Sequence, residues 1–100
     1  MKHLPKLLKY MRKFGHYTQL DLAAELGISR SYISEIEKGL KIPSVETLLK
    51  YAEFYEVPLS SLLLFAENLD NKKDFRSKAK KILTARAMQW LKWICEYKRI

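Results

Sequence analysis

Glycine, proline and cysteine are scarce in this 100-residue chain, which has three Gly, three Pro and a single Cys. Tight hairpins depend on glycine, so the composition argues against an all-β fold, while the plentiful Leu, Lys, Ala and Glu favour helices. The single Cys95 cannot form an intramolecular disulfide, which favours a reducing cytoplasm over secretion. The longest uncharged apolar stretch, residues 62–66, is far shorter than the roughly 20 residues that span a bilayer. We therefore expect a soluble, cytoplasmic, all-α protein.

Acidic residues are outnumbered, with 11 Asp and Glu against 19 Lys and Arg, so that the formal net charge is +8. Such a balance favours a polyanionic partner, either nucleic acid or an acidic membrane surface. The excess is unevenly placed: residues 1–16 carry +5, residues 17–69 carry −4 and residues 70–100 carry +7. The two flanks, rather than the middle of the chain, would therefore supply long-range attraction to a polyanion.

The spacing of apolar residues predicts five short helices and one long one. The first three are expected over residues 5–14, 19–26 and 30–38, the next two begin after Ser44 and at Pro58, and the long helix runs from about Phe75 to Tyr97. Thr18 with Asp21, and Ser29 and Ser44, are typical N-terminal caps, whereas Gly15, Gly27 and Gly39 are typical ends of helices. The expected core is Leu4, Leu7, Leu8, Met11, Leu22, Ala23, Leu26, Ile33, Ile36, Leu48, Leu49, Ala52, Phe54 or Tyr55, Leu59, Leu62 and Leu63. A polar stretch at 70–74 divides a domain over 1–69 from a helical extension over 70–100.

The segment 18–39, TQLDLAAELGISRSYISEIEKG, contains the elements of a helix-turn-helix. Ala23 is small enough for a close helix crossing, Gly27 permits the tight turn, and Ile33 and Ile36 anchor the second helix from behind. Together with 43–48 and 57–62, the segment resembles the lambda-repressor-like, or Xre-type, family of bacterial and phage regulators over about residues 8–64. The resemblance implies a compact five-helix DNA-binding domain whose third helix enters the major groove.

The same resemblance implies roles for individual residues. Arg30, Ser31, Glu35 and Ser34 match or adjoin the positions that read base edges, and Arg30 could bond guanine O6 and N7 together. The residues expected at the DNA backbone are Tyr17, Thr18, Gln19, Tyr32, Lys38, Lys41 and Ser44. Arg12 and Glu37 resemble an arginine and glutamate that tie the first helix to the third, so both are expected to be structural.

The long C-terminal helix lies outside this resemblance, and its apolar residues are placed nearly all around it, namely Trp90, Leu91, Trp93, Ile94, Cys95 and Tyr97. We expect some of that surface to form a homodimer interface, which would suit a palindromic operator. The expected interface residues are Leu83, Ala87, Trp90, Trp93, Ile94 and Tyr97. In one alternative, Trp90 and Trp93 instead fold back against the first and fifth helices.

Two further alternatives concern the partner. The extension could dock a second protein, as the regulatory domain of an antitoxin docks its toxin. The basic residues between Lys72 and Lys81 beside Trp90 and Trp93 also have the composition of an interfacial membrane helix. However, the basic and aromatic residues are separated along the helix instead of lying on opposite faces, which disfavours the membrane.

No sequence motif points to catalysis or to a cofactor. A glycine-rich phosphate loop, a nucleophile elbow and a metal-binding histidine pair are all missing from the sequence. His3, His16 and Cys95 do not have the spacing of metal ligands. The sequence therefore predicts a non-enzymatic, sequence-specific regulator of bacterial or phage origin, most simply a dimeric repressor of a promoter.

Overall fold

Capping residues and glycine-containing turns divide the chain into consecutive helices. The computed structural model describes residues 3–67 together with residues 85, 87, 89, 90 and 92. The helices are α1 (Leu4–Phe14), α2 (Gln19–Leu26), α3 (Arg30–Glu37), α4 (Val45–Phe54) and α5 (Leu59–Glu67). No strand occurs among the described residues. The all-α fold and its five short helices are confirmed, and the first three helices and the starts of the last two lie within a residue or two of those predicted.

Three hydroxyl side chains begin helices as expected. Thr18 and Asp21 form a reciprocal capping box: the Asp21 amide donates to Thr18 Oγ1 at 3.0 Å, and the Thr18 amide donates to Asp21 Oδ2 at 3.2 Å. Ser29 Oγ accepts from the Tyr32 amide at 3.0 Å, and Ser44 Oγ accepts from the Thr47 amide at 3.1 Å. Each cap satisfies an amide that has no partner within its own helix.

The turn between α2 and α3 depends on Gly27. Its φ of +68° lies in the left-handed region, where a side chain would be strained, so glycine allows α3 to begin only three residues later. Gly15 also follows a helix, but for a different reason, because its φ is −79° and the positive φ falls on His16. A Cβ atom at Gly15 would lie 2.7 Å from the ring of Tyr17, so glycine is needed there to make room.

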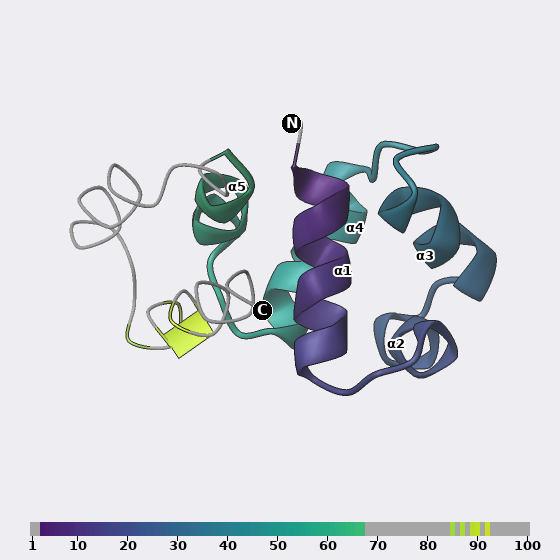
Figure 1. Ribbon diagram of the computed structural model, residues 1–100, viewed down its shortest axis with the longest axis horizontal. Helices are drawn as coiled ribbons and strands as arrows, with labels where there is room; N and C mark the ends of the chain where they lie inside the picture. The colour runs from purple at the N-terminus through teal and green to yellow at the C-terminus, as the bar shows by residue number, and fades with distance from the viewer. Residues whose placement is uncertain (1–2, 68–84, 86, 88, 91, 93–100) are drawn as a thin grey trace.

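Helix α1 lies in the middle of the fold, with α2 and α3 on one side of it and α5 on the other (Figure 1). It packs against α3 and α5, while α4 packs against α2 and α5. The core predicted for α1, α2 and α3 is buried as expected. The core residues of these three helices are Leu4, Leu7, Leu8, Met11, Leu22, Ala23, Leu26, Ile33 and Ile36.

The predicted core of α4 and α5 needs correction. Leu49 is half exposed, because the buried stripe of α4 follows Leu48, Tyr51, Ala52 and Tyr55 at helical spacing. In α5, Leu62 is buried as predicted, but Leu59 and Leu63 are only partly buried. The remaining buried positions of α5 are Ser61, Phe65 and Ala66.

The described residues of the C-terminal third belong to the core of this same chain. Residues 85, 87, 89, 90 and 92 have helical backbone, and of these Ala87 and Trp90 are buried. The indole Nε1 of Trp90 donates to the carbonyl oxygen of Tyr55 at 2.9 Å, and the two rings meet edge to face at 4.9 Å. At these two positions the structure therefore has the fold-back arrangement instead of an exposed interface. Tyr55, the partner in both of these contacts, is the residue that directly follows α4.

Four of the predicted interface residues, Leu83, Trp93, Ile94 and Tyr97, lie outside the described residues, as does most of the predicted long helix. Within the described residues, no helix is both long enough and apolar enough to cross a bilayer. The same residues contain no group of three or more side chains that could hold a metal ion.

Replacing Trp90 by phenylalanine is expected to destabilise the fold by about 1–2 kcal/mol, because it removes the hydrogen bond to Tyr55 and leaves a small void. The free energy of unfolding can be measured by chemical denaturation followed by circular dichroism. Lys92→Gln, at an exposed position two residues along the chain, is the matched control and should change the stability by less than about 0.5 kcal/mol. Equal stability of Trp90→Phe and the wild type would contradict this packing.

Candidate nucleic-acid interface

The outer face of α3 collects the four side chains predicted to read bases. Arg30 and Ser31 are exposed, and Ser34 and Glu35 are partly exposed. Their spacing of i, i+1, i+4 and i+5 places them on one continuous face of a helix with 3.6 residues per turn. Ile33 and Ile36 lie on the opposite face and are fully buried. The helix therefore presents a polar surface while its apolar stripe fixes it to the domain.

A buried ion pair holds the C-terminal end of α3 against α1. Arg12 Nε donates to Glu37 Oε2 at 2.8 Å, and Arg12 Nη2 donates to Glu37 Oε1 at 2.9 Å. Only 11% of the Arg12 side chain and 3% of the Glu37 side chain are exposed. The hydrogen bonds with Glu37 raise the pKa of Arg12 above its ordinary value, although burial acts in the opposite direction. This pairing is the structural ion pair that the resemblance implied.

The same ion pair also reaches the start of α2. Arg12 Nη1 donates to the carbonyl oxygen of Tyr17 at 2.9 Å, and Gln19 Nε2 donates to Glu37 Oε1 at 3.1 Å. We name Arg12, Tyr17, Gln19 and Glu37 the three-helix clamp. The amide group of Gln19, predicted to contact phosphate, is thus oriented by Glu37. The Oε1 atom of Gln19 has no hydrogen bond within the described part of the chain.

Four other residues predicted to contact the DNA backbone lie before α2 or directly after α3. Thr18 begins α2 and is exposed, whereas the ring of Tyr17 is partly buried and meets Phe54 edge to face at 5.3 Å. Lys38 and Lys41 are exposed in the segment that follows α3. Thr18, Lys38 and Lys41 are therefore accessible to a ligand, whereas the ring of Tyr17 has a packing role.

Tyr32 and Ser44 meet through a residue that the sequence did not single out. The hydroxyl oxygen of Tyr32 lies 3.4 Å from Thr47 Oγ1, which lies 3.0 Å from Ser44 Oγ. The hydrogen bond from Thr47 lowers the pKa of Tyr32, and further bonds to Ser44 act in the same direction. Thr47 is buried, and its hydroxyl bridges Tyr32 of α3 and Ser44, the cap of α4. The local sequence around Thr47 does not indicate that this residue contacts Tyr32.

Glu35 pairs with Lys41, and the two opposite charges lie 3.1 Å apart. In the sequence Glu35 lies about one helical turn after Arg30, where it could either accept a hydrogen bond from cytosine or orient Arg30. The structure gives it a partner in the segment after α3 instead of Arg30. With 59% of the Lys41 side chain and 34% of the Glu35 side chain exposed, the pair is solvent-screened and contributes little to stability.

A family model described as helix-turn-helix matches residues 8–62, which is more than half of the chain. The chain belongs to the helix-turn-helix family. This confirms the lambda-repressor-like resemblance, and the match ends before the C-terminal third. The helix-turn-helix itself consists of α2, the turn at Gly27 and α3.

Relatives of this helix-turn-helix protein come from archaeal, bacterial and phage sources. It is 39% identical over 61 residues to an HTH-type transcriptional regulator of Methanocaldococcus jannaschii, covering 61% of this chain and 92% of the relative. It is 41% identical over 61 residues to the ImmF control region 10 kDa protein of Bacillus phage phi105, covering 61% and 68%. It is 36% identical over 55 residues to the CTXphi transcriptional repressor RstR of Vibrio cholerae, covering 54% and 50%. No solved structure matches the chain significantly.

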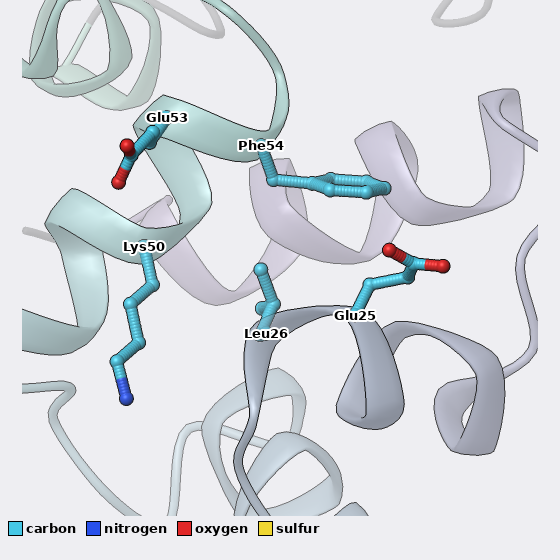
Figure 2. Close-up of a pocket in the computed structure, with 5 residues that line it drawn as sticks. All are labelled: Glu25, Leu26, Lys50, Glu53 and Phe54. Atoms are coloured by element: carbon cyan, nitrogen blue, oxygen red, sulfur yellow. The ribbon is translucent and has the colours of Figure 1, made fainter.

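One hollow of the helix-turn-helix protein is unsuited to a polyanion. It has a volume of about 300 Å³ and lies between α2 and α4. Figure 2 shows Glu25 and Leu26 coming from α2, and Lys50, Glu53 and Phe54 from α4. Two carboxylates against one ammonium make its rim acidic, which would repel phosphate. The polar face of α3 is therefore the better candidate for DNA.

Proposed function

We propose that this helix-turn-helix protein represses transcription by placing α3 in the major groove of a specific operator. The observation that carries the proposal is the polar outer face of α3, formed by Arg30, Ser31, Ser34 and Glu35 and backed by buried isoleucines. A helix held in this way can project several side chains onto base edges at once. DNA-binding transcriptional regulation is the activity of the family, and repression and the mode of groove reading are our proposals.

Contacts to the sugar-phosphate backbone would position α3. The start of α2 offers free amide groups and the oriented side chain of Gln19, while Ser44 caps α4 and the hydroxyl of Tyr32, from α3, lies beside Thr47 in the first turn of α4. Helix N-termini favour anions, and such contacts fix orientation without reading sequence. Lys41 would exchange Glu35 for a phosphate oxygen, which would release the Glu35 carboxylate to face the bases.

Long-range attraction would come from the N-terminal flank. Lys6, Lys9 and Lys13 are exposed on α1 at a spacing that gathers them on one face, whereas residues 17–69 carry a net charge of −4. Attraction of this kind raises the association rate at low salt and weakens as counterions screen it.

We further propose that two copies bind together, because two-fold symmetric regulators of this architecture read half-sites about one helical turn apart. The CTXphi relative is itself named as a transcriptional repressor, which supports the same direction of control here. The proposal requires no cofactor and no catalytic step.

Selection of bound duplexes from a random pool tests the function directly. We expect enrichment of a consensus made of two inverted half-sites, bound with a specific affinity at least about 10³-fold above that for unselected duplex. Binding to all duplexes alike, or a preference for single strands, would contradict sequence-specific repression.

A further inference from the structure

Apolar side chains are unusually exposed between the end of α3 and the middle of α4. Leu40 is 72% exposed, Ile42 92%, Val45 65% and Leu49 50%, and we name these four the α3–α4 apolar patch. Within the described residues, Leu20 is the one other large hydrophobic residue of comparable exposure. Val45 and Leu49 are four residues apart on α4, so they share one helix face. Clustered apolar exposure of this kind marks interaction surfaces, whereas single exposed residues are ordinary.

An apolar hollow adjoins the patch. It has a volume of about 340 Å³, and its lining consists of Leu4, Pro5, Ile42, Pro43 and Leu48 together with Gly39 and Lys41. Ile42 both borders this hollow and projects into solvent, so a protruding aliphatic side chain stands beside a concave aliphatic surface. A two-fold axis through this region could place the Ile42 of each copy in the hollow of the other, which is the self-complementarity that an isologous interface needs.

Charged residues around the patch are also self-complementary. Glu46 and Lys50 are four residues apart on α4. Because both signs occur on this helix, a two-fold axis can oppose Glu46 of one copy to Lys50 of the other. DNA is the poorer occupant, because four aliphatic side chains offer a phosphate backbone no hydrogen bonds.

We propose that the α3–α4 apolar patch is the surface through which two copies of this chain pair when they bind a two-fold operator. The inference rests on the proposed function, because that function supplies the two-fold symmetric operator on which the copies pair. It also moves the dimer contact away from Ala87 and Trp90, which are buried within one copy. The patch follows α3 directly in the chain, so pairing there would couple the two recognition helices over a short distance.

The test compares the full-length wild type with the double variant Ile42→Asn/Leu49→Gln, on the selected operator and on a single half-site. We expect the affinity for the full operator to fall at least tenfold, while half-site affinity stays within about twofold. Sedimentation of the free proteins should show weaker self-association of the double variant. Leu20→Gln removes an equally exposed leucine outside the patch and should leave self-association unchanged.

The other outcomes separate this inference from the proposed function. An equal loss on the half-site would mean that the patch contacts DNA, and unchanged affinity for the full operator would place the interface elsewhere; either overturns the inference and leaves the function intact. If the wild type binds no duplex selectively, the proposed function is overturned. Sedimentation alone then tests whether two copies pair through the patch. A wild type that stays monomeric both free and on duplex overturns the pairing.

A crosslinking measurement keeps the proposal testable even if the double variant folds poorly. In a Cys95→Ser background, Ile42→Cys should give covalent dimers with a short bis-maleimide reagent, whereas Leu20→Cys should not. Absence of the Ile42→Cys crosslink in a protein that sediments as a dimer would overturn the proposal.

Discussion

Replacing Arg12 by methionine is expected to lower the free energy of unfolding by about 3–5 kcal/mol, the largest stability effect that we predict for a single substitution. The change leaves the carboxylate of Glu37, 3% exposed, without its bidentate partner in a site closed to water. It also removes the donor that holds the carbonyl oxygen of Tyr17. Urea denaturation monitored by circular dichroism at neutral pH measures the loss.

The double variant Arg12→Met/Glu37→Leu distinguishes an unpaired charge from simple loss of packing. We expect it to recover most of the lost stability, because replacing both partners with apolar groups removes the cost of burying a lone charge. If the double variant is as unstable as Arg12→Met alone, the cause is the changed packing of α1 and not the carboxylate. Lys13→Met, at the exposed neighbouring position, is the control for the effect of charge removal on α1.

We expect the three-helix clamp to couple stability to the proposed reading of DNA by α3. Glu37 is the last residue of α3, and through Arg12 and Gln19 it fixes that end relative to α1 and to the start of α2. In the recovered double variant, α3 keeps its buried isoleucines but Gln19 loses the acceptor that orients its amide. We therefore expect operator binding to remain impaired in a protein whose stability has been largely restored.

Local chemistry explains why the helices could be predicted from the sequence. Thr18, Ser29 and Ser44 each cap an amide three residues away, and Gly27 needs only its own backbone freedom. Such signals involve neighbours in the chain, so they can be read without knowing the fold. The exposed face of α3 follows from the same periodicity once Ile33 and Ile36 are assigned to the core.

Contacts between distant residues could not be predicted in this way. The bond from Gln19 to Glu37 spans 18 positions and that from Trp90 to Tyr55 spans 35, and nothing in either local sequence indicates the partner. The exposure of Leu49 has a similar origin, because the face of α4 that is buried depends on where α2 and α5 pack against it. The pairing of Glu35 with Lys41 depends on the path of the chain after α3.

Replacing Arg30 by alanine is expected to reduce the affinity for the selected operator by about 1–3 kcal/mol, which is roughly 5- to 150-fold. Arg30 is the first residue of α3 and is exposed, and it makes no ion pair within the part of the chain that the structure describes. Its guanidinium group is therefore available to form two hydrogen bonds with guanine in the major groove. Competition binding on the operator and on a set of singly substituted duplexes measures both the affinity and the discrimination at each base pair.

Lys41→Ala is the matched control, because Lys41 is also a basic residue beside the face of α3 but would contact phosphate. Its loss should weaken all duplexes alike and lower the slope of log affinity against log salt by about one unit. Arg30→Ala, in contrast, should remove the preference at one base pair of each half-site while unselected duplex is bound nearly as before. A uniform loss across every sequence in Arg30→Ala would mean that Arg30 contacts the backbone, and the reading of bases would then have to be assigned to Ser31, Ser34 and Glu35.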